Sequence, residues 1–138
     1  MYSILDHNVF IMWKPEYDLG IHIIDEQHRG VVTIINSLYY GIQNEYIEDM
    51  LIPIIEMISD YTKIHFQIEE DFLDKCRYPD VTSHCALHAE LIAKLAIIGS
   101  KSLSEQDPYK FLEFLKKWWI DHIRTEDYVF RDYLLNRQ

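Results

Sequence analysis

The chain contains 138 residues, of which 49% are hydrophobic and 14% are aromatic, with only four glycines and four prolines. This composition is too apolar for a disordered protein and suits a single domain built from long regular elements. The formal net charge of -10, from 23 acidic and 13 basic residues, argues against nucleic acid and membranes as partners, because both attract a basic surface.

Cysteine content and the N-terminal residues bear on the cellular compartment. Only two cysteines, Cys76 and Cys85, are present, so we expect buried thiols and no disulfide framework; redox sensing is the alternative role. The N-terminal MYSILDHNVFIMW lacks the basic region of a secretory signal, and no apolar run approaches the length of a membrane span. We therefore expect a cytoplasmic protein.

The first part of the chain predicts an arm followed by a helix. Residues 1–20 lack helical periodicity and contain Trp13 and Tyr17, so we expect an extended arm that packs aromatic side chains on the body. Apolar residues at helical spacing predict the first helix over about 22–44, with Asp25 as a candidate N-cap.

Three further helices are predicted over about 45–76, 81–101 and 108–136. Asp80 is a candidate N-cap of the third, and Asp107-Pro108 is a cap followed by proline at the first helical position of the fourth. The stretch Lys101–Gln106 is predicted to be a solvent loop. The expected fold is all-α: an up-down-up-down antiparallel four-helix bundle with an N-terminal extended arm, in one domain spanning 1–138.

Two pairs of potential metal ligands lie within 65–88. His65 and Glu69 are four residues apart, as are His84 and His88, and residues four apart share one face of a helix. Pro79 lies between the pairs and favours a turn that folds the second pair back against the first. Imidazole nitrogen and carboxylate oxygen suit a first-row transition metal such as iron, zinc or manganese.

The bundle topology brings three more ligand-type residues to the same end. His28 lies near the start of the first helix, and His122 and Asp127 lie in the second half of the fourth. At a rise of about 1.5 Å per residue, all seven groups fall within roughly 5–20 Å of one end. His122 and Asp127 are five residues apart and diverge by about 140° on an ideal helix, so either a π-type bulge or a sideways aspartate is required.

The number of ligand-type groups indicates two metals. Five imidazoles and two carboxylates exceed the four ligands of a zinc site, but they suit two ions bridged by both carboxylates. If a solvent oxygen also bridges, three imidazoles complete six-coordination on one ion and two leave an open position on the other. The alternative, core histidines without a metal, would need a hydrogen-bond partner for each buried imidazole.

Four segments, together with Trp13 and Tyr17, carry a resemblance to a known family. They are GIHIIDEQH (Gly20–His28), HFQIEE (His65–Glu70), RYPDVTSHCALH (Arg77–His88) and WWIDHIRTED (Trp118–Asp127). In these segments the sequence resembles the hemerythrin family, in particular the bacteriohemerythrins, over essentially the whole chain.

The resemblance implies a non-haem di-iron site that binds dioxygen reversibly, for storage, delivery or sensing. The two iron ions would be bridged by Glu69, Asp127 and a solvent-derived oxo or hydroxo group. The closed iron would be held by His84, His88 and His122, and the open iron by His28 and His65. Dioxygen is the implied ligand, and a protein partner for delivery or reduction is left unidentified.

One residue departs from the family pattern. Trp119 stands where relatives usually have a leucine that lines the oxygen pocket, and tryptophan is larger and brings an N–H donor. The alternative function is therefore a di-iron peroxidase, oxidase or nitric oxide reductase with the pocket altered by Trp119. A sensory or interaction module is a third hypothesis. His7, His22 and Glu70 match no ligand position and are expected at the surface or behind the ligands.

Overall fold

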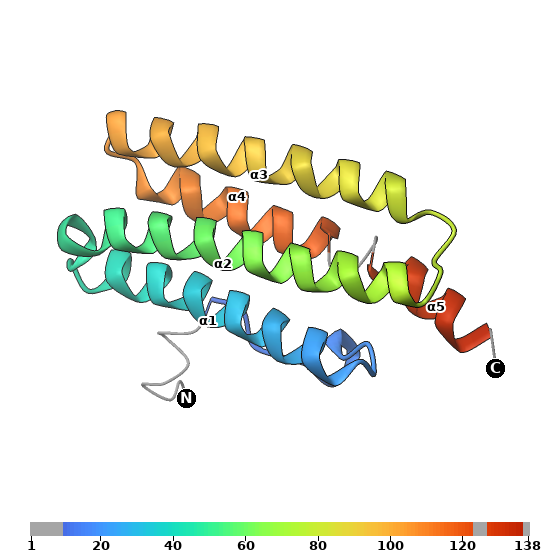
Figure 1. The fold of residues 1–138 in the computed structure, drawn as a ribbon. Coiled ribbons are helices and arrows are strands. Elements are labelled where there is room, and N and C mark those ends of the chain that lie inside the picture. The colour runs from blue at the N-terminus through green and yellow to red at the C-terminus, as the bar shows by residue number, and fades with distance from the viewer. Residues whose placement is uncertain (1–9, 123–126, 137–138) are drawn as a thin grey trace.

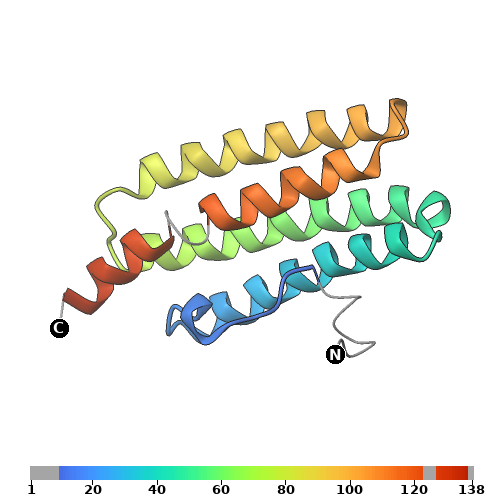
Figure 2. The ribbon, with the colours of Figure 1, turned by 180° about the vertical axis from the view of Figure 1, so that it is seen from behind.

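The computed structural model describes residues 10–122 and 127–136. After a short 3-10 turn at Pro15–Tyr17, its helices are α1 (His22–Gln43), α2 (Ile47–Lys75), α3 (Val81–Ser104), α4 (Pro108–Asp121) and α5 (Tyr128–Asn136). Within the described ranges there is no strand. Helix α1 packs on α2 and α4, and α3 packs on the same two helices, with consecutive helices antiparallel (Figures 1 and 2). The predicted all-α four-helix bundle is confirmed.

The connection between α3 and α4 is shorter than expected. Helix α3 continues through Ser104, so the prediction of a solvent loop over Lys101–Gln106 is wrong. Ser102 is fully buried, which holds this segment against the bundle, and the chain turns only at Gln106, where φ is 53°. Asp107 then caps α4, as predicted, because its side chain accepts a backbone hydrogen bond from the first turn of that helix.

The fourth predicted helix, about 108–136, is described as two helices, α4 and α5. Residues 123–126 lie outside the described residues. On either side of them, His122 and Asp127 have a π-helical backbone. A π-helical turn is wider than an α-helical one, so it can bring residues five apart toward the same face. The five-residue spacing predicted either a π-type bulge or a sideways aspartate, and the π-helical backbone at these two residues corresponds to the first.

The described part of the N-terminal arm packs against α1 and α4. The side chain of Asn36 on α1 accepts a hydrogen bond from the N–H of Ile11 and donates one to its carbonyl oxygen, both at 2.8 Å. The rings of Trp13 and Tyr17 each lie 5.8 Å from the ring of Trp119. The arm therefore covers this part of α4 with aromatic side chains.

The apolar core consists of two clusters. The larger includes the fully buried Ile35, Leu38 and Ile58, and the smaller includes Leu73 and Phe130. Along α1 and α3 the buried histidines lie between the residues of the two clusters, and along α2 Glu69 lies between Phe66 of the larger cluster and Leu73 of the smaller. A polar layer therefore interrupts an otherwise apolar interior.

Contrary to the expectation that no apolar run approaches a membrane span, helix α3 is long and apolar enough, by length and composition alone, to cross a membrane. In the bundle it packs against α2 and α4 and carries the buried imidazoles of His84 and His88. These contacts identify it as a helix of the bundle.

Asp25 fixes the turn that precedes α1. The helix begins at His22, so Asp25 lies inside its first turns and is not the N-cap that the sequence suggested. Its buried carboxylate accepts hydrogen bonds from the N–H groups of Leu19, at 2.7 Å, and Gly20, at 3.1 Å. Gly20 has a φ of 87°, a conformation that suits glycine. Asp25 thus sets the start of the helix that carries His28.

Replacing Asp25 by alanine should lower the free energy of unfolding by about 1–3 kcal/mol, because the buried N–H of Leu19 loses its acceptor and the partly buried bond from the N–H of Gly20 is lost as well. Urea denaturation at pH 7 measures the change. Glu26→Ala is the matched control: Glu26 is exposed on the same turn, and its loss should change stability by no more than about 0.5 kcal/mol. Equal effects of the two substitutions would contradict the role given to Asp25.

Candidate metal centre

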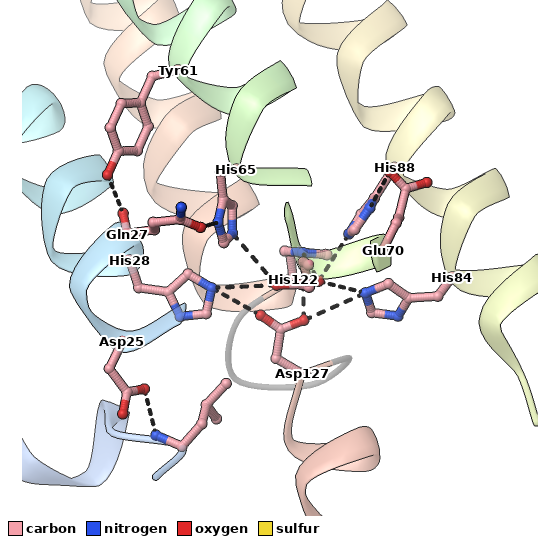
Figure 3. A network of polar contacts seen from close by, with 12 residues as sticks. Asp25, Gln27, His28, Tyr61, His65, Glu70, His84, His88, His122 and Asp127 are labelled. Atoms are coloured by element: carbon pink, nitrogen blue, oxygen red, sulfur yellow. Dashed lines mark hydrogen bonds and ion pairs between the residues drawn. The ribbon is translucent and has the colours of Figure 1, made fainter. Parts of the chain in front are cut away.

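Seven ligand-type side chains gather at one point between the helices (Figure 3). Each is at most 5% exposed; they are His28, His65, Glu69, His84, His88, His122 and Asp127. They come from α1, α2, α3 and the two ends of the α4–α5 connection, with His28 on α1 and Asp127 directly before α5. The structure therefore brings together every residue that the sequence predicted as a metal ligand.

The carboxylate of Glu69 lies at the centre of this group and divides the histidines into two sets. Its Oε1 atom lies 2.7, 3.1 and 3.9 Å from the Nε2 atoms of His84, His88 and His122. Its Oε2 atom lies 3.5 and 3.7 Å from the Nε2 atoms of His65 and His28. One oxygen thus faces three imidazoles and the other faces two.

Asp127 repeats the same division from the opposite side. Its Oδ1 atom lies 3.5 Å from Nε2 of His122 and 3.7 Å from Nε2 of His84. Its Oδ2 atom lies 3.1 Å from Nε2 of His28. Both carboxylates therefore span the two histidine sets, as bridging ligands between two cations would.

Most of these buried atoms have no hydrogen-bond partner. They include Nε2 of His28, His65, His88 and His122, and both carboxylate oxygens of Asp127. Each such atom is costly to bury unless something replaces its contact with water. Cations between the carboxylates and the imidazoles would satisfy the whole set, and its nitrogen and oxygen donors are those that first-row transition metals prefer. The residues therefore fit a pair of such ions.

Burial and crowding keep two of the imidazoles neutral. Burial lowers the pKa of His65 to about 3, against the opposing attraction of Glu69. Burial also holds the pKa of His122 well below its ordinary value. Both rings are thus neutral at pH 7, which is the form that binds a metal.

The pKa values of Glu69, His28 and Asp127 are shifted by burial and by their mutual attraction or repulsion. Burial alone would raise the pKa of Glu69, but the attraction of the neighbouring imidazoles, with His28 and His84 first, outweighs it and holds that pKa well below its usual range. Burial lowers the pKa of His28, but Asp127 and Glu69 outweigh it and raise that pKa to about 9. Burial, and then the charge of Glu69, raise the pKa of Asp127 to about 7. A bound cation would displace the proton held between His28 and Asp127.

A further layer of polar groups orients the imidazoles. Nδ1 of His65 lies 2.7 Å from Oε1 of Gln27, so it carries the proton and leaves Nε2 to face Glu69. The hydroxyl of Tyr61 donates to the carbonyl oxygen of Gln27 at 3.0 Å. Sequence analysis missed Gln27, because no spacing pattern distinguishes it from other glutamines. Glu70 lies behind the ligands, as expected, with Oε2 3.7 Å from Nδ1 of His88.

Other residues singled out in the sequence lie around or outside this cluster. Trp119 is 1% exposed, and its ring stands edge-on to the ring of His28 at 5.7 Å. His22 is exposed and lies outside the cluster, whereas His7 falls outside the described residues. Burial, followed by a hydrogen bond with Glu70, raises the pKa of the partly buried Cys85 to about 11. That thiol therefore stays protonated, which disfavours a redox-sensing role.

Comparison with known proteins agrees with this geometry. A family model described as the hemerythrin HHE cation binding domain matches residues 19–134. The chain belongs to the hemerythrin family. A bacteriohemerythrin of Clostridium acetobutylicum is 33% identical over 129 residues, covering 89% of this chain and 98% of the relative. A bacteriohemerythrin of Stenotrophomonas maltophilia is 28% identical, covering 88% and 80%. A hemerythrin-like protein of Naegleria gruberi is 24% identical, covering 88% and 92%.

For this hemerythrin, His88→Ala should lower both the bound iron per chain and the melting temperature, because metal binding contributes to the stability of the fold. The matched control is His22→Ala, which removes an exposed imidazole from α1. Elemental analysis and thermal unfolding of protein produced with excess iron give the two measurements. Unchanged iron content in the His88 variant would exclude it as a ligand.

Proposed function

We propose that the chain is a non-haem di-iron protein that binds dioxygen reversibly, for storage, delivery or sensing. The observation that carries the proposal is the position of the two carboxylates. One oxygen of each lies near the set His84, His88 and His122, and the other lies near the set His28 and His65. Membership of the hemerythrin family and the buried cation-type cluster support a non-haem iron protein.

We assign each histidine set to one iron. His84, His88 and His122 would hold the closed ion, and His28 and His65 the open one. Glu69 and Asp127 would bridge the ions together with a solvent-derived oxo or hydroxo group. With three shared oxygens each, the first ion would be six-coordinate and the second would retain one position for a small ligand.

The surrounding residues suit reversible binding of a small apolar molecule. When bound, a reduced iron pair would supply the two electrons that reversible binding of dioxygen requires. The chain holds the imidazoles in place through Gln27 and Glu70, and it keeps bulk water away because no side chain of the cluster exceeds 5% exposure. Exclusion of water limits irreversible loss of reduced oxygen species.

Trp119 is the residue proposed to line the oxygen pocket. Its ring packs against His28, which belongs to the two-histidine set, and Trp13 and Tyr17 pack on its other edges. The wall over the open iron is therefore aromatic and large. A ligand that reaches this iron from the side of the arm must pass these rings.

Features of Trp119 also favour a second candidate function, a di-iron peroxidase, oxidase or nitric oxide reductase. The indole N–H of Trp119 is buried without a hydrogen-bond partner, so it can donate to a ligand on the neighbouring iron. Steady turnover of hydrogen peroxide or nitric oxide well above that of free iron would favour this enzymatic role. No turnover above that background would reject it.

We place the protein in the cytoplasm, with dioxygen as its ligand and no nucleic acid or membrane partner. The acidic balance of 23 carboxylates against 13 basic residues supports this assignment, as does the lack of a disulfide among the described residues. A protein partner for delivery or reduction is compatible with the acidic surface, which would attract a basic protein.

The reversible function is tested with the iron-loaded protein reduced under anaerobic conditions. Admission of oxygen should produce a new visible absorption band, and removal of oxygen under vacuum should abolish it over several cycles. Permanent oxidation in the first cycle, without such a band, would reject reversible binding while leaving the iron site intact. His88→Ala is the control that separates loss of iron from loss of oxygen binding.

Trp119→Leu should accelerate entry of small ligands to the open iron, because it removes most of a buried ring beside His28. Stopped-flow binding of azide to the oxidised protein measures the rate, and we expect the variant to lose about 2–4 kcal/mol of stability through the cavity. Trp118→Leu is the matched control, since the Trp118 ring stacks on His122 of the three-histidine set. Equal rates for the wild type and both variants would contradict a pocket role for Trp119.

A further inference from the structure

A continuous run of aromatic rings leads from the two-histidine set into the N-terminal arm. The ring of Trp119 lies 5.7 Å from that of His28. On its other edges it lies 5.8 Å from the ring of Trp13 and 5.8 Å from the ring of Tyr17. Trp13 and Tyr17 are themselves 5.5 Å apart. These are the separations of rings in contact, so no other side chain is needed to connect them.

The run consists of side chains that can be oxidised, because indole and phenol rings lose one electron far more readily than a phenyl ring does. No comparable run leaves the three-histidine set among the described residues. There, Trp118 makes ring contacts only with Phe66 and His122. Tyr78 is connected to that set through the ring of Phe130. A phenyl ring therefore interrupts each route on that side.

The run ends beside solvent. Trp119 is 1% exposed, whereas Tyr17, at the end of the 3-10 turn of the arm, is 8% exposed. Both residues line a surface hollow of about 230 Å³ between the arm and α4. Small molecules in this hollow can therefore reach the outer end of the run without entering the metal centre.

Local groups favour Tyr17 over Trp13 as the outer end. The guanidinium of Arg29, which also pairs with Asp18 at 3.3 Å, lies 4.9 Å from the centre of the Trp13 ring. A cation in that position opposes the loss of an electron from the ring. The indole nitrogens of Trp13 and Trp119 are buried without a hydrogen-bond partner, so neither oxidised indole has an acceptor for its proton. Tyr17 borders the hollow, where water can take the phenol proton.

Positive charge beside the hollow favours an anionic reductant. Lys14 and Lys116 line it. Lys14 forms only a long, exposed ion pair with Glu16, at 4.0 Å, and the ammonium of Lys116 lies over the ring of Phe10 at 5.0 Å. In a chain with a net charge of -10, this local positive charge attracts a small anion more strongly than the surrounding surface does.

We propose that Trp119 and Tyr17 form a relay that carries oxidising equivalents from the open iron to the surface, where a small anionic enediol such as ascorbate quenches them. The relay rests on the iron pair of the proposed function, and the oxidant is hydrogen peroxide, which takes two electrons and two protons to form two waters. In each pass Trp119 gives one electron to the oxidised centre and recovers one from Tyr17, whose phenol proton leaves to water. The ascorbate monoanion then returns a hydrogen atom to Tyr17 and becomes the ascorbyl radical anion. Two passes reduce one peroxide.

The test mixes the iron-loaded full chain with hydrogen peroxide, freezes the mixture rapidly and records its electron paramagnetic resonance spectrum. We expect a tyrosyl radical signal that ring-deuterated tyrosine narrows. Tyr17→Phe should replace it by a tryptophan radical signal, and Trp119→Phe should remove most of both signals. Trp118→Phe and Tyr133→Phe are the matched controls and should keep the tyrosyl signal, because neither residue belongs to the relay. If Trp119→Phe fails to fold, the change of signal in Tyr17→Phe decides.

The reductant is tested by the decay of the tyrosyl signal after ascorbate is added. Replacing both Lys14 and Lys116 by glutamine should slow this decay at least about twofold. Decay with hydroquinone, which is uncharged, should stay unchanged in the same variant. Lys63→Gln is the matched control, because it removes an exposed lysine from α2, away from the hollow. Equal ascorbate rates in the wild type and the double variant would overturn the anionic reductant.

The remaining outcomes separate the relay from oxygen binding. Absence of a radical in the wild type, or an undiminished signal in Trp119→Phe, would overturn the relay. A tyrosyl signal that Tyr17→Phe leaves unchanged would overturn Tyr17 as its outer end. Radical formation in a protein that fails the oxygen test would support the relay while rejecting reversible oxygen binding. Reversible oxygen binding without a radical would reject the relay alone.

Discussion

The central constraint of this structure is the fully buried carboxylate of Glu69. An isolated charge at such a position would be prohibitively costly, yet five imidazoles from all four walls of the bundle lie within 3.9 Å of its oxygens. Their attraction holds the pKa of Glu69 low despite burial. Each helix must therefore be rotated about its axis, and placed along it, so that its histidine reaches Glu69. This single carboxylate thereby fixes how the helices align with one another.

The two apolar clusters on either side of this polar layer contribute differently to the stability of the fold. The larger cluster spans all of the bundle helices α1 to α4 and carries most of the fully buried aliphatic and aromatic side chains, so it can hold the helices together by burial alone. The smaller cluster, which includes Leu73 and Phe130, closes the bundle beyond the ligands. Metal binding would then stabilise chiefly the end of the molecule where the polar layer weakens the core.

The fold and the gathering of the seven ligand-type residues could be predicted, because helical period and antiparallel topology are both encoded in the spacing of residues. The pairs His65–Glu69 and His84–His88 needed only four-residue separation on helices. What could not be predicted depends on tertiary contacts. Gln27 on α1 contacts His65 on the neighbouring α2. Asp25 binds the turn that precedes α1 and does not cap the helix. Ser102 is buried, and the polar stretch around it is helical.

The adjacent tryptophans give the centre two different sides. Neighbouring residues on a helix point about 100° apart, so the side chains of Trp118 and Trp119 contact different histidine sets. The ring of Trp118 stacks on His122 with planes 2° apart, whereas that of Trp119 meets His28 edge-on at 86°. One tryptophan thus borders the three-histidine set, and the other covers the two-histidine set. The two histidine sets are therefore lined by different tryptophans, so the effect of substituting one can be separated from the effect of substituting the other.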